Sequence, residues 1–240
     1  MIKLNNSSSN YNLFSSELGE FPKASPLLIN TINQYSYCIA EEDPEFKKAL
    51  INSDVLLPDG VSIVLVNKFL NQQKIRKIAG ADIHKYYLEV LNENSGKCFY
   101  LGSSGSTLAK IVKKISKEYP KINVQTFSPP FKPQFTEDEN LEMINAINAF
   151  EPDVLFIGMT APKQEKWANQ HKPAIQAKAI CTIGAVFDFY AETVERPSQI
   201  WVNLGLEWFV RLVKEPKRMW KRYIYYGPVF IYKIIKEKLQ

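Results

Sequence analysis

Residues 153–167 have the sequence DVLFIGMTAPKQEKW. The apolar run 153–157, with turn residues behind it, is typical of a buried strand. Pro162 follows the turn, and proline is favoured at the first position of a helix, so a helix is expected from there onward. Strand, polar turn and helix in this order form half of a βαβ unit, which implies a parallel sheet.

The same alternation of apolar runs and helical periodicity continues along the chain. It predicts an α/β fold with a largely parallel sheet covered by helices on both faces. Strands are expected near 27–31, 35–40, 54–57, 97–101, 122–127, 153–157 and 178–183. Helices are expected near 44–52, 61–70, 82–93, 105–118, 137–149, 163–171 and 203–214, with another after Pro216.

Composition limits the class of protein. The 240 residues are 45% hydrophobic and 23% charged, which suits one large domain or one domain with an appendage. Three cysteines without metal-like spacing favour buried thiols in a reducing compartment. There is no Asp-x-Asp motif, no pair of carboxylates spaced for Mg²⁺ or Mn²⁺, and no run of roughly 18 apolar residues. A cytoplasmic protein without a metal or cofactor is therefore expected.

Positive charge is concentrated at the C-terminal end. Residues 207–240 contain nine Lys and Arg against three Glu, a net charge of +6, and eight aromatic residues. Basic residues interleaved with Trp and Tyr are typical of a segment in a membrane interface, where each contributes about 1 kcal/mol of attraction to anionic lipid. A solvated helix packed on the domain is the alternative. Nucleic acid is not expected as a partner, because the apolar bulk of 223–235 would not contact a phosphate backbone.

These observations predict three parts. They are a loose, Ser- and Asn-rich N-terminal tail (1–20), an α/β domain (21–202) and a basic, aromatic, membrane-associating helical appendage (203–240).

Polar or glycine-bearing loops follow five of the expected strands. In a parallel sheet such loops emerge at the carboxyl edge, where open α/β folds bind ligands. Gly102 and Ser103 lie in LGSSGST, where small residues would let backbone N–H groups approach a phosphate. A Ser/Gly helix cap without a ligand would have the same sequence. Gly158 and Gly184 occupy equivalent places in two other loops.

Several side chains in these loops have both a functional and a structural explanation. Asp59, between Pro58 and Gly60, could accept a proton from a hydroxyl nucleophile or cap the next helix. Asp82 could bond a sugar hydroxyl or cap a helix in the same way. Thr31 and Asn33 lie near the end of an early strand, where such residues are also common turn formers.

The helix after Pro162 carries Lys163, Gln164 and Glu165 in its first turn. Glu165 suits the helix dipole, which is a sufficient structural reason for it. Lys163 and Gln164 have no such reason, and an amide with a donor and an acceptor suits a base edge or a sugar. These residues are therefore expected in a ligand site.

Six motifs in one order resemble the WecG/TagA/CpsF glycosyltransferases from about residue 30 to 223. They are TIN, LPDG, GAD, LFIGMTAPKQEKW, IGAVFDFYAETVERPS and GLEWFVRLVKEPKRMWKRY. The resemblance implies a Rossmann-like α/β fold and a metal-independent, inverting hexosyltransferase. The enzyme would transfer a sugar from a UDP-sugar to a polyprenyl-diphosphate-linked sugar. The transferred sugar would be N-acetylmannosamine, its uronic acid or a related hexose. The product would serve cell-surface polysaccharides such as teichoic acid or capsule.

The resemblance also implies residue roles. Asp59 would be the general base, and Thr31 and Asn33, with Asp82, would line the acceptor and sugar pocket. The nucleotide-sugar would contact Gly102, Ser103, Gly158, Lys163, Gln164, Glu165 and Gly184. Arg196, Arg211, Arg218 and Arg222 would close over the site and meet the diphosphates. Many members have Ala-Gly where this chain has Ala191-Glu192. Many also have Arg-Ala-Pro where this chain has Arg196-Pro197-Ser198. These departures bear on the identity of the donor sugar.

The resemblance places the enzyme at the inner face of the cell membrane as a peripheral protein, and a homo-oligomer is compatible with it. Two other classes remain open from the sequence. A non-catalytic, membrane-recruited scaffold would bind a UDP-sugar yet release no UDP when acceptor is present. A nucleic-acid-binding domain would bind DNA or RNA through its tail in a salt-sensitive manner.

Overall fold

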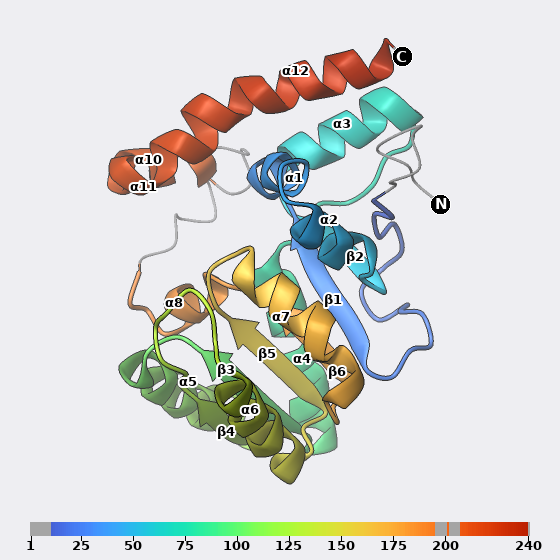
Figure 1. Ribbon diagram of the computed structural model, residues 1–240. Helices are drawn as coiled ribbons and strands as arrows, with labels where there is room; N and C mark the ends of the chain where they lie inside the picture. The colour runs from blue at the N-terminus through green and yellow to red at the C-terminus, as the bar shows by residue number, and fades with distance from the viewer. Residues whose placement is uncertain (1–10, 195–200, 202–206, 240) are drawn as a thin grey trace.

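The computed structural model describes residues 11–194, 201 and 207–239. Its centre is a single sheet with the strand order β2-β1-β6-β5-β3-β4, parallel throughout (Figure 1). The fold is therefore α/β and Rossmann-like, as predicted. The strands are β1 (Leu27–Ile32), β2 (Val55–Pro58), β3 (Lys97–Gly102), β4 (Asn123–Phe127), β5 (Val154–Gly158) and β6 (Ala179–Thr182).

Helices connect the strands and follow the sheet. As far as α8 they are α1 (Gln34–Ala40), α2 (Pro44–Ile51), α3 (Val61–Asn71), α4 (Gly80–Asn94), α5 (Gly105–Glu118), α6 (Glu137–Phe150), α7 (Lys163–His171), the short 3₁₀ turn η1 (Lys172–Ala174) and α8 (Val186–Tyr190). The C-terminal segment contains α10 (Glu207–Lys214), α11 (Pro216–Trp220), the π-helical turn η2 (Lys221–Tyr225) and α12 (Tyr226–Lys238).

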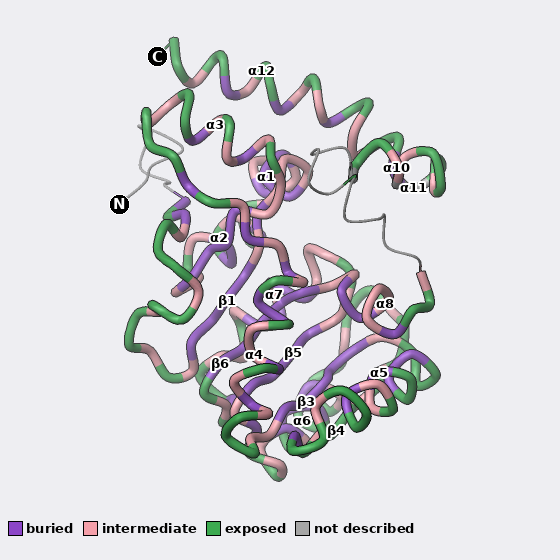
Figure 2. Tube along the Cα trace, turned by 180° about the vertical axis from the view of Figure 1, so that it is seen from behind, coloured by how far each residue is buried: buried purple, intermediate pink, exposed green. Residues whose placement is uncertain are grey.

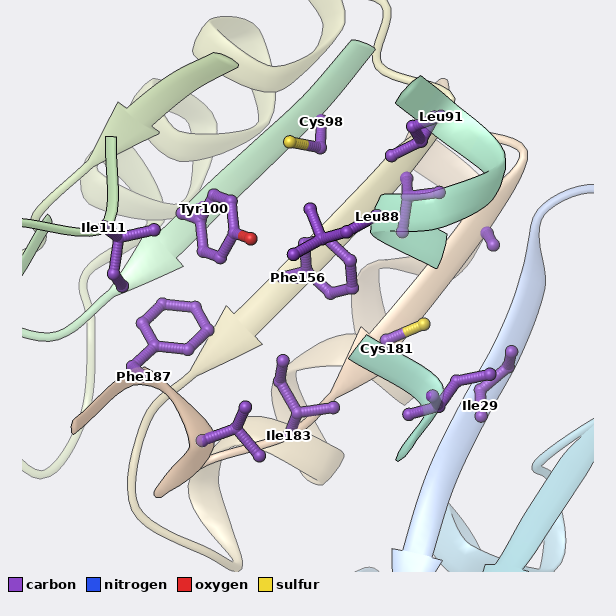
Figure 3. Close-up of a cluster of buried hydrophobic side chains, with 14 of the residues drawn as sticks. Ile29, Leu88, Leu91, Cys98, Tyr100, Ile111, Phe156, Cys181, Ile183 and Phe187 are labelled. Atoms are coloured by element: carbon purple, nitrogen blue, oxygen red, sulfur yellow. The ribbon is translucent and has the colours of Figure 1, made fainter. Parts of the chain in front are cut away.

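Both faces of the sheet are buried except at the edge strand β4, whose residues are half-buried or exposed, and the buried strands are almost continuous apolar runs. Side chains alternate along β3, where Tyr100 enters one core cluster and Phe99 the other. The first cluster lies under α4, α5 and α8, and Figure 3 shows Tyr100, Phe156 and Phe187 converging in it. The second cluster lies under α6 and α7. A third unites α1, α2 and α3 with α12.

The prediction of a strand at 35–40 is wrong, because this segment is helix α1. Aromatic and β-branched residues favoured a strand, but Asn33 caps a helix here. Its Oδ1 accepts hydrogen bonds from Tyr35 N and Ser36 N, each at 3.0 Å. Ser36 Oγ accepts in return from Asn33 N at 2.7 Å. This capping box fixes the start of the helix regardless of the propensities behind it.

The expectation of a loose tail is wrong for residues 11–14. Tyr11 and Leu13 are buried, and Tyr11 Oη donates to Glu41 Oε1 at 2.8 Å. Leu13 forms an isolated parallel bridge with Leu56, and Phe14 N donates to Leu56 O at 2.9 Å. This segment therefore pairs with the outer edge of β2, an edge that would otherwise expose unpaired backbone groups.

The last helix is anchored in the domain. Tyr226, Phe230 and Ile234 on α12 are buried in the third cluster. Phe230 meets Tyr37 of α1 edge-on, with ring centroids 5.4 Å apart. Figure 1 shows α12 lying over α1 and beside α3, at the end of the molecule opposite α6. The C-terminal segment thus completes a hydrophobic cluster of the domain. Within the described residues, no helix has the length and hydrophobicity needed to cross a bilayer.

Replacing Phe230 with alanine should lower the free energy of unfolding by about 3 kcal/mol or more, because it leaves a cavity between α12 and α1. Urea unfolding followed by circular dichroism measures the change. Tyr232→Ala, on the exposed side of the same helix, serves as the control and should shift stability by about 0.5 kcal/mol or less. Equal effects of the two substitutions would contradict this docking of α12.

Candidate functional site

The carboxyl edge of the sheet gathers the loops that the sequence singled out. The connection after β3 runs outward to β4, whereas the connection after β5 runs the other way, to β6. A topological switch point therefore lies between β3 and β5, the place where open α/β folds bind ligands. Gly102 and Gly158 are register partners there, each at the end of its strand.

Gly102 is required by its backbone. Its φ is +114°, and a Cβ atom at this position would lie 2.5 Å from the carbonyl oxygen of Gly158. Ser103 follows in the left-handed region, and its carbonyl accepts a hydrogen bond from Ser128 Oγ at 2.8 Å. Ser104 then caps α5, with Oγ accepting from Thr107 N at 3.2 Å. Ser104 is therefore the helix cap, while Gly102 and Ser103 form the turn that follows β3 at the switch point.

The loops after β1 and β2 bring Asn33 and Asp59 together. Asp59 N donates to Ile32 O at 2.8 Å, which holds the two loops in register. A Cβ atom on Gly60 would lie 3.8 Å from Asn33 Cβ. The N-cap residue of α3 is Gly60, and no side chain bonds the helix from that position. Thr31 is the register partner of Leu57 just below these loops.

Gln164 ties together the loops after β5 and β6. Its side chain is buried, and Oε1 accepts a hydrogen bond from Met159 N at 3.1 Å. A Cβ atom on Gly184, where φ is +47°, would lie 3.3 Å from Gln164 Nε2. A Cβ atom there would contact the amide tightly, so glycine at this position leaves Gln164 room. Gln164 therefore packs against the backbone of the β6 loop while it fixes the backbone of the β5 loop.

Glu165 lies beneath Gln164 and is only 3% exposed. Gln164 Nε2 donates to its Oε1 at 2.8 Å, and Oε2 has no hydrogen-bond partner. Burial raises the pKa of Glu165 to about 7, only partly opposed by the bond from Gln164. A half-satisfied buried carboxylate is costly, and such groups concentrate at functional sites.

Lys163 points elsewhere. Its Nζ donates to Lys132 O at 2.5 Å and lies 3.4 Å from the ring centroid of Phe135. Burial lowers the pKa of Lys163. The sequence predicts that Lys163, Gln164 and Glu165 contact one ligand together, but their side chains lie in three different environments. Lys163 holds the proline-rich loop 128–136, Gln164 braces two backbone loops, and Glu165 is turned inward.

Arg222 lies near the carboxyl end of β1, at the start of helix α1. Its guanidinium carbon lies 4.7 Å from the ring centroid of Tyr35, which follows Asn33 by two residues. Gln34 Nε2 also donates to Arg222 O at 3.5 Å. Arg211 and Arg218 lie on α10 and α11, and their side chains fall outside what the structure describes; Arg196 lies wholly outside the described residues.

Asp82 and Glu192 are both engaged by their surroundings. Asp82 Oδ2 accepts from Ala79 N at 2.7 Å and so caps α4, the structural explanation that the sequence offered. It also lines a hollow of about 290 Å³ with Arg76, Lys77 and Lys85. Glu192 forms an ion pair with Lys114 of α5, which directs its added charge toward α5.

The order of strands determines how far apart Asp59 and Gln164 lie along the carboxyl edge of the sheet. Two strands, β1 and β6, separate β2 from β5. Asp59 and Gln164 thus share one edge of the sheet, about 14 Å apart by strand spacing. Among the described residues, no group of three His, Cys, Asp or Glu side chains could hold a metal ion.

Comparisons with known proteins identify the class. A family model, Glycosyl transferase WecG/TagA/CpsF family, matches residues 7–240. The chain is 29% identical over 211 residues to the N-acetylglucosaminyldiphosphoundecaprenol N-acetyl-beta-D-mannosaminyltransferase of Bacillus subtilis (strain 168), covering 88% of this chain and 80% of the relative. A protein of the same name from Staphylococcus aureus (strain MW2) is 27% identical over 212 residues, 88% and 81% of the two chains. The chain therefore belongs to the WecG/TagA/CpsF glycosyltransferase family, as its motifs predicted.

Sequence reasoning missed one residue beside the site and one buried polar residue within the sheet. Tyr35, whose ring contacts Arg222, lies in the segment 35–40, where the sequence predicts a strand and the structure has the start of helix α1. Asn30 is fully buried inside β1 and accepts from Thr182 Oγ1 of β6 at 2.6 Å. A polar residue within an apolar strand was the available signal for Asn30.

The buried carboxyl group gives a pH-dependent prediction. Because its pKa rises from 4.5 to about 7 on folding, the folded chain holds more protons between these pH values. Its contribution to stability is therefore fully present below pH 4.5 and is lost as the pH rises through about 7. Glu165→Gln should match the wild type at low pH and exceed it by up to about 3 kcal/mol above neutrality.

Urea unfolding at several pH values measures this difference. Glu142→Gln removes an exposed carboxylate from α6 and serves as the control, with no growing advantage at high pH. If the two variants show the same pH dependence, Glu165 is not buried as a strained carboxyl group.

Proposed function

We propose that this chain transfers a sugar from a UDP-sugar to a polyprenyl-diphosphate-linked sugar, with inversion at the anomeric carbon. Family membership and the names of the relatives support this reaction class. The observation that carries it is that the loops after β1 and β2, which hold Asn33 and Asp59, lie side by side, while Arg222 lies over Tyr35 at the start of α1. A carboxylate, an amide and a guanidinium at one edge can bind a hydroxyl acceptor that carries a diphosphate.

The proposed step is a direct displacement. The acceptor hydroxyl attacks the anomeric carbon, the bond from that carbon to the UDP oxygen breaks, and Asp59 takes the hydroxyl proton. Negative charge develops on the departing diphosphate. Backbone N–H groups at the switch point and arginines of the C-terminal segment would stabilise that charge. Metal independence is part of the proposal and follows from the family resemblance.

The donor is proposed to lie toward the loops that follow β3, β5 and β6. Gly102, Ser103, Gly158 and Gly184 lie in these loops at the strand ends, where their backbone N–H groups would meet the donor, and Gln164 holds the loop geometry. N-acetylmannosamine is the sugar named for the relatives, and N-acetylglucosamine is named in their acceptors. We propose the same pair here, and a UDP-release screen over several UDP-sugars would separate it from the uronic acid or a related hexose.

The C-terminal segment is proposed to hold the enzyme at the inner, anionic surface of the cell membrane, where a polyprenyl-linked acceptor resides. Exposed aromatic and aliphatic side chains on α10 and α11, among them Trp208, Phe209, Val213 and Trp220, support this role. Aromatic rings and basic residues of this kind suit a membrane interface.

Asp59→Asn should lower kcat/KM about a hundredfold or more while leaving the fold intact, because it removes the base but keeps the shape. UDP release with UDP-N-acetylmannosamine and a polyprenyl-diphosphate-N-acetylglucosamine acceptor measures it. Asp138→Asn, an exposed change on α6, is the control. Near-normal turnover of the Asp59 variant would remove this residue from the role. Donor binding without UDP release by the wild type would instead support a scaffold.

Arg222→Gln should lower kcat/KM for the diphosphate-bearing acceptor about tenfold or more, because a charge-assisted contact to the diphosphate is lost. Lys221→Gln, which removes an exposed neighbouring charge from the same helical turn, should have little effect in the same assay. An equal loss for both variants would point to general electrostatic attraction and away from a specific contact by Arg222.

A further inference from the structure

Helix α3 is apolar on its outer side as well as on its inner side. Ile63 is buried in the third cluster, as expected for a helix that covers a core. Leu65 and Phe69 are 60% and 51% exposed, one helical turn apart, and Val61 precedes them by another turn. Lys68 is the only charged residue in the helix. A helix that is hydrophobic on all sides is normally buried or in contact with lipid.

Helix α12 has the same two-sided character. Its inner side carries Phe230 and Ile234, and its outer side carries Ile231 and Ile235, again one turn apart, with Leu239 at its end. The outer residues are 50% exposed or more.

The two helices lie side by side. Lys238 Nζ donates to Phe69 O at 3.1 Å and lies 3.5 Å from the ring centroid of Phe69. The C-terminal ends of α3 and α12 therefore meet, and both views of the chain show the helices adjacent at one end of the molecule (Figures 1 and 2). Exposed residues recur along both helices in Figure 2. We call the exposed residues Val61, Leu65, Phe69, Ile231, Ile235 and Leu239 the outer stripe.

The charges beside the outer stripe are of one sign. Helix α3 contains no acidic residue, and exposed Lys68 lies on its outer side. Lys236 is exposed on α12, and Lys74 is exposed in the loop after α3. The acidic residue of α12, Glu237, turns inward and accepts from Tyr37 Oη at 3.3 Å. Apolar residues flanked by lysines complement a bilayer surface that contains anionic lipid.

We infer that α3 is a second lipid-contacting helix, which docks with α12 through the outer stripe onto an anionic bilayer surface. A second copy of the chain fits this face less well. A two-fold interface would place the same lysine-flanked patch against itself and bring like charges together. The lipid surface is therefore the occupant that the charges favour.

Docking through α3 would connect the membrane with the site. Helix α3 begins at Val61, directly after Asp59 and its neighbour Gly60. The helix is about 16 Å long, so lipid contact along it would fix how far Asp59 stands from the headgroups. This consequence rests on the proposed function, because it assigns Asp59 to a lipid-linked acceptor. The lipid contact itself does not depend on that function.

The test compares matched leucines in the full-length chain. Leu65→Glu places a carboxylate in the outer stripe, and Leu141→Glu makes the same change at a leucine of α6 that is 54% exposed. Helix α6 lies at the opposite end of the molecule (Figure 1). Binding is measured by co-sedimentation with vesicles of phosphatidylcholine and about one-third phosphatidylglycerol. No donor or acceptor is added.

Leu65→Glu should weaken vesicle binding about tenfold or more, because it removes apolar contact and adds repulsion from anionic lipid. Leu141→Glu should bind as the wild type does. Leu65→Gln should lie between them, and it keeps the test valid if the carboxylate variant fails to fold. Transfer to a water-soluble, short-chain acceptor should be unchanged by Leu65→Gln, whereas transfer to a long-chain acceptor in vesicles should fall.

Equal vesicle binding by the wild type and both Leu65 variants would overturn the proposal. So would a dimer, seen by analytical ultracentrifugation, that Leu65→Glu dissociates while vesicle binding stays the same. A wild type that binds vesicles through Leu65 but releases no UDP would overturn the proposed function and leave the lipid contact standing.

Discussion

The edge-on packing of Phe230 against Tyr37 joins the last helix of the chain to the first, and the arrangement of the site depends on it. Tyr226 adds a second such contact with Tyr35, at 5.2 Å between ring centroids. These contacts bury one side of α12 in a cluster that also contains Ile63 of α3. They leave the chain just before α12 beside the start of α1, where Gln34 Nε2 donates to Arg222 O and the Arg222 guanidinium lies over Tyr35.

A second constraint acts at the middle of the sheet. All strands run in one direction, so the loops that follow them share one edge of the sheet. At the switch point the backbones of Gly102 and Gly158 approach so closely that no side chain fits at Gly102. Gln164 then joins the β5 loop to the β6 loop through a buried amide, with the Glu165 carboxyl group beneath it. Burying a carboxyl group with one unpaired oxygen lowers stability. The chain accepts this cost at the place where two loops must keep a fixed shape.

Much of the architecture could be predicted from local pattern, because strands buried on both faces are continuous apolar runs and their helices carry clear periodicity. The prediction failed where a local signal contradicted the propensities around it. Asn33 caps a helix whose aromatic residues favour a strand. Tyr11 and Leu13 lie in a polar segment, yet they are buried because β2 offers a free edge. The burial of Tyr11 and Leu13 is not visible without knowing which strand is at the edge, whereas the capping box of Asn33 and Ser36 is a local signal that the aromatic residues around it outweighed.

For the candidate site too, some features could be predicted from the sequence and others depend on the tertiary structure. The sequence by itself determined the residue types at the strand ends, the family motifs that contain Asp59 and Gln164, and the excess of positive charge in the last 34 residues. Only the tertiary structure decided that Glu165 is buried, that Asp82 caps α4, and that α3 lies beside α12 with a second apolar side exposed. The physical reason is the distance along the chain over which each interaction acts. Turn chemistry and periodicity act over a few residues, whereas burial and the pairing of helices depend on segments that are distant in sequence and meet only when the chain folds.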